Sequence, residues 1–194
     1  PLDVTTYLAA TKFDYAPGKL MGTGTTLETL RLKRIIANHY NVSAKDVQGF
    51  MLGEHGNSAF PAWSTVSIGG VPLNQLDTFY DHNEPLSCKT VAQEVVNTAY
   101  DVLQSKGWTN TGIAMGACRL AKAVFYDEHA VLPVSMPFHG EYDIHDVSLS
   151  LPSIIGKEGV VKRIPLPLPA AEAALLRQSA DSVKEVLRAN KVIQ

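Results

Sequence analysis

Three side chains in the first third of the sequence could together move a proton to and from a substrate oxygen. Glu28 and Arg31 lie three residues apart in T-L-E-T-L-R, and His55 lies in the segment G-E-H-G. A histidine titrates near neutral pH, and a neighbouring carboxylate fixes its tautomer and stabilises the imidazolium. An arginine can bind a substrate carboxylate through two parallel hydrogen bonds. These groups suit the interconversion of a 2-hydroxy acid and a 2-oxo acid, in which a cofactor carries the hydride.

Each of these residues also has a simpler explanation when it is taken alone. Residues three apart on a helix share one face, so Glu28 and Arg31 could form an exposed ion pair of little energetic value. His55 is one of six histidines, and a single histidine is often structural or exposed. The glycines beside it favour a loop that approaches a ligand closely at the end of an apolar strand. From the residues alone, both interpretations stay open.

The segment G-T-G-T-T at residues 22–26 begins like a nucleotide-binding loop. A dinucleotide fingerprint requires G-x-G-x-x-G after a strand, but Leu27 occupies the third glycine position. The chain also contains no G-x-x-x-x-G-K-[ST] sequence. The segment therefore predicts a tight turn before a helix, with Thr25 or Thr26 as the helix N-cap.

The periodicity of apolar residues predicts five helices, which cover residues 1–11, 26–40, 87–105, 109–127 and 170–191. Strands are predicted at 47–52 and 63–68, and three more follow in series within 130–136, 147–156 and 160–166. The last helix is expected to bury one apolar face, formed by Leu175, Leu176, Ala180, Val183, Val186 and Leu187. This order predicts a single α+β domain over residues 1–194, with long helices packed on antiparallel strands.

The composition of the 194-residue chain is that of an ordinary globular protein, with 45% hydrophobic and 19% charged residues. A net charge of −2 gives no basic surface for nucleic acid. No run reaches the roughly 18 apolar residues that a membrane span needs, and the N-terminus does not resemble a secretory signal. Cys88 and Cys118 lack metal-ligand spacing, so we expect free thiols, no metal site and a cytoplasmic location.

Two segments carry a resemblance to a known family. M-G-T-G-T-T-L-E-T-L-R-L-K and F-M-L-G-E-H-G-N-S-A-F-P-A-W-S resemble the C-terminal, substrate-binding half of the L-lactate/malate dehydrogenase family. The similarity extends from Pro1 to the terminal helix. The form G-E-H-G is similar to the lactate branch, and H-G-N is similar to L-2-hydroxyisocaproate dehydrogenases.

The resemblance implies a role for five residues. His55 would be the proton donor and acceptor with Glu28 as its partner, and Arg31 would bind the substrate carboxylate. Thr109 matches a position that lines the pocket for the substrate side chain, and Ile113 matches one that packs against the nicotinamide of NAD. Without the resemblance, Thr109 would be interpreted as a helix N-cap and Ile113 as a core residue.

The sequence departs from the family at two places. The partner of the family's histidine is normally aspartate, whereas this chain has Glu28, so an altered but working pair is expected. Allosteric bacterial members bind fructose bisphosphate at positions that match Lys33 and Gln48. Because Gln48 cannot supply a cation, we do not expect strong activation by the sugar bisphosphate.

The resemblance also implies that the N-terminal NAD-binding Rossmann domain is not part of this chain, which begins at Pro1. The chain alone would then be inactive, whereas the full-length enzyme would form a homodimer or homotetramer and act on a small 2-oxo or 2-hydroxy acid. L-lactate dehydrogenase is the leading interpretation. The alternatives are an L-2-hydroxyisocaproate-type or malate dehydrogenase domain, or a non-catalytic oligomerisation module that kept the fold.

Overall fold

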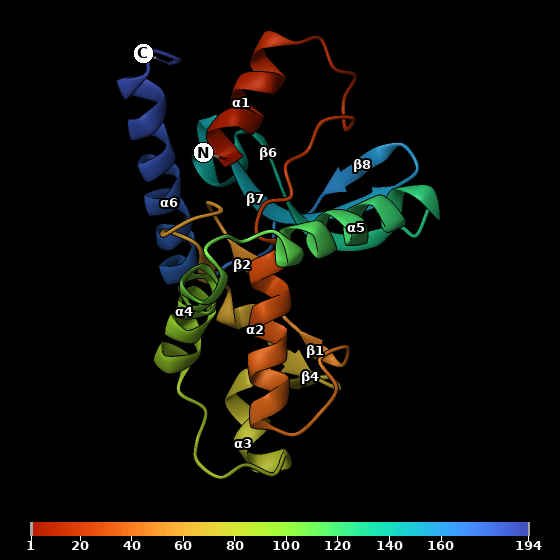
Figure 1. The fold of residues 1–194 in the computed structure, drawn as a ribbon, viewed down its shortest axis with the longest axis vertical. Helices are drawn as coiled ribbons and strands as arrows, with labels where there is room; N and C mark the ends of the chain where they lie inside the picture. Colours follow the sequence, from red (N-terminus) through yellow and green to blue (C-terminus); the bar gives the residue numbers. More distant parts are fainter. Residues whose placement is uncertain (1, 194) are drawn as a thin grey trace.

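A three-stranded antiparallel sheet packs against a long C-terminal helix at one side of the molecule. The computed structural model describes residues 2–193 (Figure 1). Its α-helices are α1 (Leu2–Lys12), α2 (Thr26–His39), α3 (Leu76–Phe79), α4 (Cys88–Lys106), α5 (Thr111–Phe125) and α6 (Ala170–Ala189). Its strands are β1 (Val47–Gln48), β2 (Met51–Leu52), β3 (Phe60–Pro61), β4 (Ser67–Ile68), β5 (Val71–Pro72), β6 (Ala130–His139), β7 (His145–Gly156) and β8 (Gly159–Arg163).

The large sheet has the order β6-β7-β8, and all its neighbours are antiparallel. Val134 on β6 pairs with Leu151 on β7, and both side chains are fully buried. Leu149 and Leu151 pack in the same cluster as Leu176 and Leu187 of α6. Burial of such side chains contributes roughly 1.5–3 kcal/mol each. The sheet and α6 are therefore the rigid base on which the shorter elements lie.

Two small antiparallel sheets carry the loops near α2. Strands β1, β4 and β5 form one sheet, and β2 pairs with β3 in the other. A second buried cluster joins Leu32 and Ile36 of α2 to Val47 and Met51 of these strands, and to Val91 of α4. The helix α2 is thus fixed between the small sheets and α4, as seen in Figure 1.

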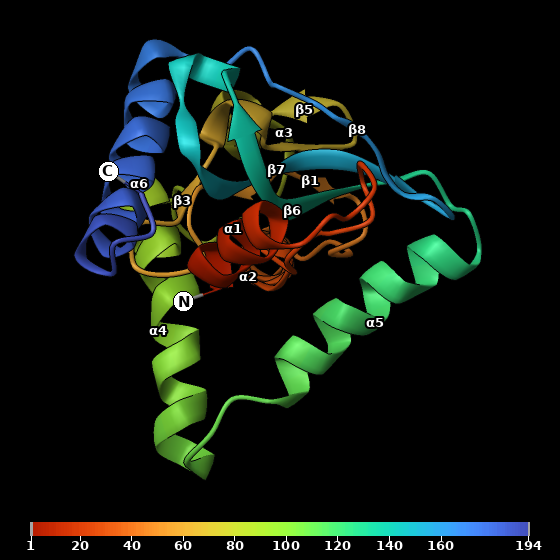
Figure 2. The same cartoon turned by 90° about the horizontal axis from the view of Figure 1, so that it is seen from above.

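Helix α4 extends away from the large sheet, and α5 leads back to it from a short connection (Figure 2). Leu120 of α5 packs in one cluster with Val134 and Ile155 of the sheet. The Ser87 hydroxyl caps α4 by accepting a hydrogen bond from the Thr90 amide. Gly107 ends the helix in the left-handed conformation, with φ of 80°, as the sequence predicts. The next helix starts at Thr111 with Asn110 as its N-cap, so the simpler interpretation of Thr109 as the cap is wrong.

The observed elements confirm the predicted α+β fold, including the three strands in series. The predicted strand 47–52 is divided into β1 and β2, which are separated by Gly49 with φ of 141° and by Phe50. The predicted strand 63–68 is wrong in its first half, because residues 63–65 form a 3₁₀-helix. Two residues assigned to the buried face of the last helix are exposed, Leu175 by 43% and Val186 by 47%. The prediction at Pro1 lies outside the described residues.

Some features of the structure have no counterpart in the sequence prediction. The short helix α3 and the strand β5 belong to this group. Within residues 2–193, no helix is both long enough and apolar enough to cross a membrane.

Candidate active site

The N-terminal turn of α2 is held against the strands by its threonines. The Thr25 hydroxyl donates to the Met51 carbonyl at 2.6 Å, and the Thr29 hydroxyl accepts from the Met51 amide at 2.9 Å. The Thr26 hydroxyl donates to the Pro133 carbonyl on β6 at 2.8 Å. Thr25 is the N-cap residue, as the sequence predicts, but its hydroxyl does not cap the helix, because the hydroxyls of Thr25 and Thr26 both bind outside it. Glu28 and Arg31 therefore project from a helix whose start is fixed.

Gly24 has a packing reason to be glycine. Its φ is 50°, and a Cβ atom there would lie 2.7 Å from the Ser135 amide nitrogen on β6. The backbone thus packs directly on the large sheet, and a side chain has no room. The structure agrees with the predicted tight turn at residues 22–26.

His55 lies in the loop that follows β2. Gly53 begins the loop with φ of 88°, and the Glu54 amide donates to the Ser179 hydroxyl of α6 at 2.7 Å. The His55 amide donates to the Asp3 carboxylate of α1 at 2.7 Å. Two helices that are distant in the sequence therefore hold the backbone of this loop.

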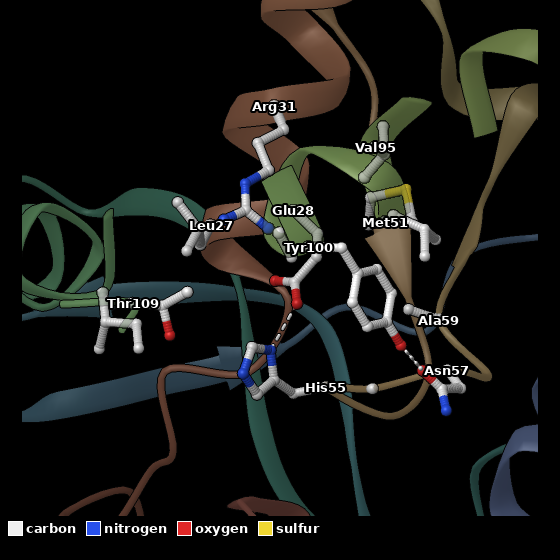
Figure 3. Close-up of a pocket in the computed structure, with 14 residues that line it drawn as sticks. Leu27, Glu28, Arg31, Met51, His55, Asn57, Ala59, Val95, Tyr100 and Thr109 are labelled. Carbon is white, nitrogen blue, oxygen red and sulfur yellow. Dashed lines mark hydrogen bonds and ion pairs between the residues drawn. The ribbon is translucent and has the colours of Figure 1, made fainter. Parts of the chain in front are cut away.

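The His55 imidazole and the Glu28 carboxylate form a close pair (Figure 3). His55 Nδ1 lies 2.5 Å from Glu28 Oε1, and the side chains are 32% and 12% exposed. The hydrogen bond that the imidazole donates to Glu28 raises the pKa of His55, partial burial opposes this effect, and the charges of Glu28 and Asp3 raise the pKa further. Since Nδ1 faces Glu28, Nε2 is the ring nitrogen left for a ligand, and it has no hydrogen-bond partner within residues 2–193.

The five side chains predicted from the sequence line one cleft with a volume of about 200 Å³. They are Glu28 and Arg31 from α2, His55 from its loop, Thr109 from the α4–α5 connection and Ile113 from α5. In Figure 3 the Arg31 guanidinium and the His55 imidazole lie on opposite sides of the Glu28 carboxylate. The structure thus brings together residues that are up to 85 positions apart in the chain (113 − 28).

Arg31 is free to bind a ligand. Glu28 directs its carboxylate to His55, and the described part of the chain contains no hydrogen bond or ion pair to the Arg31 guanidinium. The surface ion pair between Glu28 and Arg31 is therefore absent from residues 2–193. A partly buried arginine without a partner favours an anion, such as a carboxylate, at this position.

The rest of the cleft is largely apolar. Its apolar side chains come from α2, β2, the His55 loop, α4 and α5, and they are Leu27, Met51, Ala59, Val95, Val96, Ala99 and Ile113. Ile113 is 43% exposed, so its simpler interpretation as a core residue is wrong. The Tyr100 hydroxyl reaches Asn57 Oδ1 at 3.4 Å along one edge (Figure 3). The arrangement can orient a small acid through its carboxylate while its apolar end faces these side chains.

Sequence reasoning missed the residues that support the cleft from outside. Asp3 and Ser179 bind the amides of the His55 loop, and the predicted periodicities gave no reason to connect them to it. Tyr100 and Asn57 at the cleft edge were likewise not selected. The sequence shows only that Asp3 is an acidic residue in the first turn of a predicted helix. Such a residue normally interacts with the helix dipole, so its presence did not indicate a contact with the His55 loop.

Two further predictions concern fructose bisphosphate and metal ions. Lys33 lies on α2, where burial lowers its pKa, and Gln48 lies on β1. The expected lack of activation by fructose bisphosphate stays a prediction. Within residues 2–193, no three His, Cys, Asp or Glu side chains are arranged to hold a metal ion.

The chain is similar to known proteins in its amino-acid sequence. Residues 25–192 match the family described as lactate/malate dehydrogenase, alpha/beta C-terminal domain. An L-lactate dehydrogenase from Selenomonas ruminantium is 48% identical over 96% of this chain and 59% of that protein. L-lactate dehydrogenase 2 from Clostridium acetobutylicum is 43% identical over 97% of this chain and 59% of that protein.

Two solved structures resemble the fold over nearly the whole chain. The minor L-lactate dehydrogenase from Enterococcus mundtii, in a ligands-bound form, has a TM-score of 0.89 and 36% identity. A lactate dehydrogenase from a Medee basin deep-sea metagenome library has a TM-score of 0.91 and 31% identity. Each match covers 97% of this chain and 60% of the other. The chain therefore spans about 60% of the length of these relatives.

Proposed function

Because the chain belongs to the lactate/malate dehydrogenase family and matches its C-terminal domain, we propose that it is the substrate-binding part of an NAD-dependent L-lactate dehydrogenase. The complete enzyme would interconvert pyruvate and L-lactate, with the NAD-binding domain supplied outside residues 1–194. One observation carries the proposal: a His55–Glu28 pair at 2.5 Å lines the same cleft as an arginine without a partner.

Each polar residue of the cleft has a separate task. Arg31 binds the carboxylate of the 2-oxo acid and so orients its carbonyl group. His55, held by Glu28 at Nδ1, donates a proton from Nε2 to the carbonyl oxygen during reduction and takes it back during oxidation. Glu28 stabilises the imidazolium and fixes the ring orientation. Thr109 and the apolar side chains enclose the methyl end of the substrate.

The cleft fits one end of the nicotinamide cofactor. Ile113 is apolar, 43% exposed, and on the cleft wall beside Thr109, so it can pack against one face of a nicotinamide ring. NAD, when bound, supplies or accepts the hydride. The adenosine and phosphate parts would bind to the domain outside this chain, which agrees with the unsuitable glycine pattern at residues 22–26.

A second substrate class is favoured by the shape and chemistry of the cleft. Six apolar side chains besides Ile113 line it, so branched 2-oxo acids of the L-2-hydroxyisocaproate type are the second candidate. Malate dehydrogenase activity is the third candidate, and the part of the enzyme outside this chain would have to supply a second cation for the second carboxylate. Among the described lining residues, Arg31 is the one permanently charged cation.

The proposal includes a homodimer or homotetramer of the complete enzyme. Large apolar side chains are exposed along α5 and at its ends: Phe125 by 85%, Tyr126 by 73%, Met115 by 65% and Trp108 by 61%. Exposed apolar side chains clustered on one element are typical of surfaces that contact another domain or subunit. A non-catalytic oligomerisation module would use the same surface, but it would not need the arrangement around His55.

The test completes the enzyme and follows pyruvate-dependent oxidation of NADH. The chain is expressed behind its own upstream coding sequence, or behind the N-terminal part of the Selenomonas ruminantium relative. We expect turnover, a loss of about 10²–10⁴-fold in kcat for His55→Gln, and a rise of roughly 10–100-fold in KM for Arg31→Gln. Arg34→Gln, one turn further along α2 and outside the cleft lining, is the matched control.

The competing outcomes are distinct. Faster turnover with 4-methyl-2-oxopentanoate than with pyruvate would select the second candidate. A folded, NADH-binding enzyme that reduces neither acid would refute the dehydrogenase proposal and favour the non-catalytic module. Equal effects of Arg34→Gln and Arg31→Gln would refute the proposed role of Arg31.

A further inference from the structure

A second carboxylate, separate from Glu28, holds the other side of His55. Asp3, in the first turn of α1, is only 2% exposed. Its Oδ2 accepts the His55 amide at 2.7 Å, and its Oδ1 accepts the Ser135 hydroxyl of β6 at 2.5 Å. Asp3 therefore joins α1, the large sheet and the His55 loop at one point.

We propose that Asp3 is a positioning residue for His55, which fixes the backbone that presents the imidazole to Glu28 and places a second negative charge near the imidazolium. The effect on turnover rests on the proposed function, because it assumes that His55 transfers the proton. The effect on the His55 ring and its backbone does not depend on any activity.

The bonds within the loop do not involve His55, so the contact from outside determines where its backbone lies: the Ser58 hydroxyl donates to Glu54 Oε2 at 2.5 Å, and the Ala59 amide donates to the Gly56 carbonyl at 3.3 Å. Gly56 and Asn57, which follow His55, are exposed. Within the loop, the Gly56 amide donates to the Glu54 carbonyl at 3.0 Å. From outside, Ser179 binds the Glu54 amide and Asp3 binds the His55 amide. Of these two contacts, the one at Asp3 acts on the residue that carries the imidazole.

The short contact between His55 and Glu28 makes this backbone contact important. The two side-chain atoms are 2.5 Å apart, and α2 is fixed by the bonds of its own threonines. A rotation or shift of the His55 peptide therefore cannot be followed by Glu28. Misplacement of a reacting group by about 1 Å can lower a rate by about 10²-fold.

The burial of Asp3 indicates that its negative charge acts on a neighbouring group. Burial raises the pKa of this carboxyl, which means that the surroundings disfavour the charged form, while the bonds from Ser135 and His55 lower it. A neutral side chain could accept the same amide without that penalty. Among residues 2–193, the groups that act on the pKa of His55 are Glu28 on α2 and Asp3 on α1, and Glu54 in the loop acts on Asp3 in turn.

Two substitutions separate the backbone contact from the charge. Asp3→Asn keeps the size and an acceptor for the His55 amide but removes the charge. Asp3→Leu keeps the branching at Cγ, with a larger volume, and removes both. The matched control is Thr6→Val in the same helix, because Thr6 is 6% exposed and its hydroxyl donates within α1 to the Leu2 carbonyl.

The first readout is nuclear magnetic resonance of the 194-residue chain, which reports the pKa of the His55 ring and the hydrogen exchange of its amide. We expect Asp3→Asn to keep the amide protected and to lower the pKa of His55. We expect Asp3→Leu to lower the pKa and also to remove the protection, whereas Thr6→Val changes neither. An unchanged pKa of His55 in Asp3→Asn, or an amide that stays protected in folded Asp3→Leu, would refute the proposal.

The second readout is turnover of the completed enzyme. Asp3→Leu is expected to lose about 10²-fold in kcat with little change in KM. Asp3→Asn should keep most of the parent kcat, but the pH dependence of its kcat should be shifted. If Asp3→Leu does not fold, Asp3→Asn and Ser135→Ala decide the question through the His55 resonances. If His55→Gln stays fully active, the proposed function fails, while the resonance data still test the positioning by Asp3.

Discussion

Replacing Glu28 by aspartate would restore the residue that the family normally carries, yet we expect it to lower activity in this protein. The Glu28 carboxylate reaches His55 Nδ1 at 2.5 Å. Aspartate is shorter by one C–C bond of about 1.5 Å, so the contact would open to roughly 4 Å if the backbone stays in place. The backbone of α2 has little freedom to follow, because Thr25 and Thr29 bind both polar groups of the Met51 backbone.

The size of the effect follows from this displacement. A shift of about 1 Å in a reacting group can lower a rate by about 10²-fold, which equals roughly 2.7 kcal/mol. Loss of a hydrogen bond to a charged group costs about 1.5–3 kcal/mol, which agrees with that size. We therefore expect Glu28→Asp to lower kcat for pyruvate by about 10²-fold and to lower the pKa of His55.

The assay is NADH oxidation by the completed enzyme at saturating pyruvate, with the resonance of the His55 ring as a second measurement. Glu94→Asp on the exposed face of α4 is the matched control, and it should leave both quantities unchanged. Activity of Glu28→Asp equal to or above that of the parent protein would refute the reasoning, since it would show that the longer side chain is not required here.

Further expectations concern pH, stability and regulation. The pKa of His55 is raised in the folded state, so the His55–Glu28 pair stabilises the protein below about pH 6.5, and this gain is lost as pH rises through the raised pKa. Urea titrations should therefore show that Glu28→Gln lowers the free energy of unfolding more at pH 5.5 than at pH 9. Equal losses at the two pH values would contradict this. Gly107→Ala should cost about 1 kcal/mol in unfolding free energy, because a Cβ there has space but φ is 80°; no loss in Tm would count against the strain. Leu151→Ala in the fully buried core should cost about 2–5 kcal/mol by denaturant unfolding. Fructose bisphosphate should not activate the completed enzyme, because Gln48 carries no charge, and strong activation in a titration would overturn this.

The helices and the strands of the large sheet could be predicted because their apolar periodicity matches their burial. The heptad-like spacing of Leu176, Ala180, Val183 and Leu187 predicts their buried face correctly. The same pattern failed for Leu175 and Val186, which lie at the border of that face, where hydrophobicity alone does not decide burial.

Short elements were less predictable, because they are fixed by contacts that are distant in the sequence. Residues 63–68 alternate like a strand, but Ser64 binds the buried Glu172 of α6 through its amide and its hydroxyl. These contacts hold the first half in a 3₁₀ turn. A pattern over six residues contains no information about α6.

The candidate site likewise contains residues that the sequence could predict and residues that it could not. Glu28, Arg31 and His55 could be selected from residue types and spacing, and the resemblance added Thr109 and Ile113. The contact of Asp3 with His55 spans 52 residues and uses a backbone amide, which has the same chemistry in every residue but proline. No sequence pattern marks such a partner, so it becomes visible only in three dimensions.

The central claim, that His55 carries the proton between enzyme and substrate, is tested most directly by measuring kcat/KM against pH in both directions. Reduction needs protonated His55 and oxidation needs the neutral form. The account therefore expects pyruvate reduction to fall as pH rises and lactate oxidation to fall as pH decreases, with one shared apparent pKa above 6.5, raised by Glu28. The shared pKa should move down in Glu28→Gln. Profiles that lack a common pKa, or one that is unchanged in Glu28→Gln, would contradict the account.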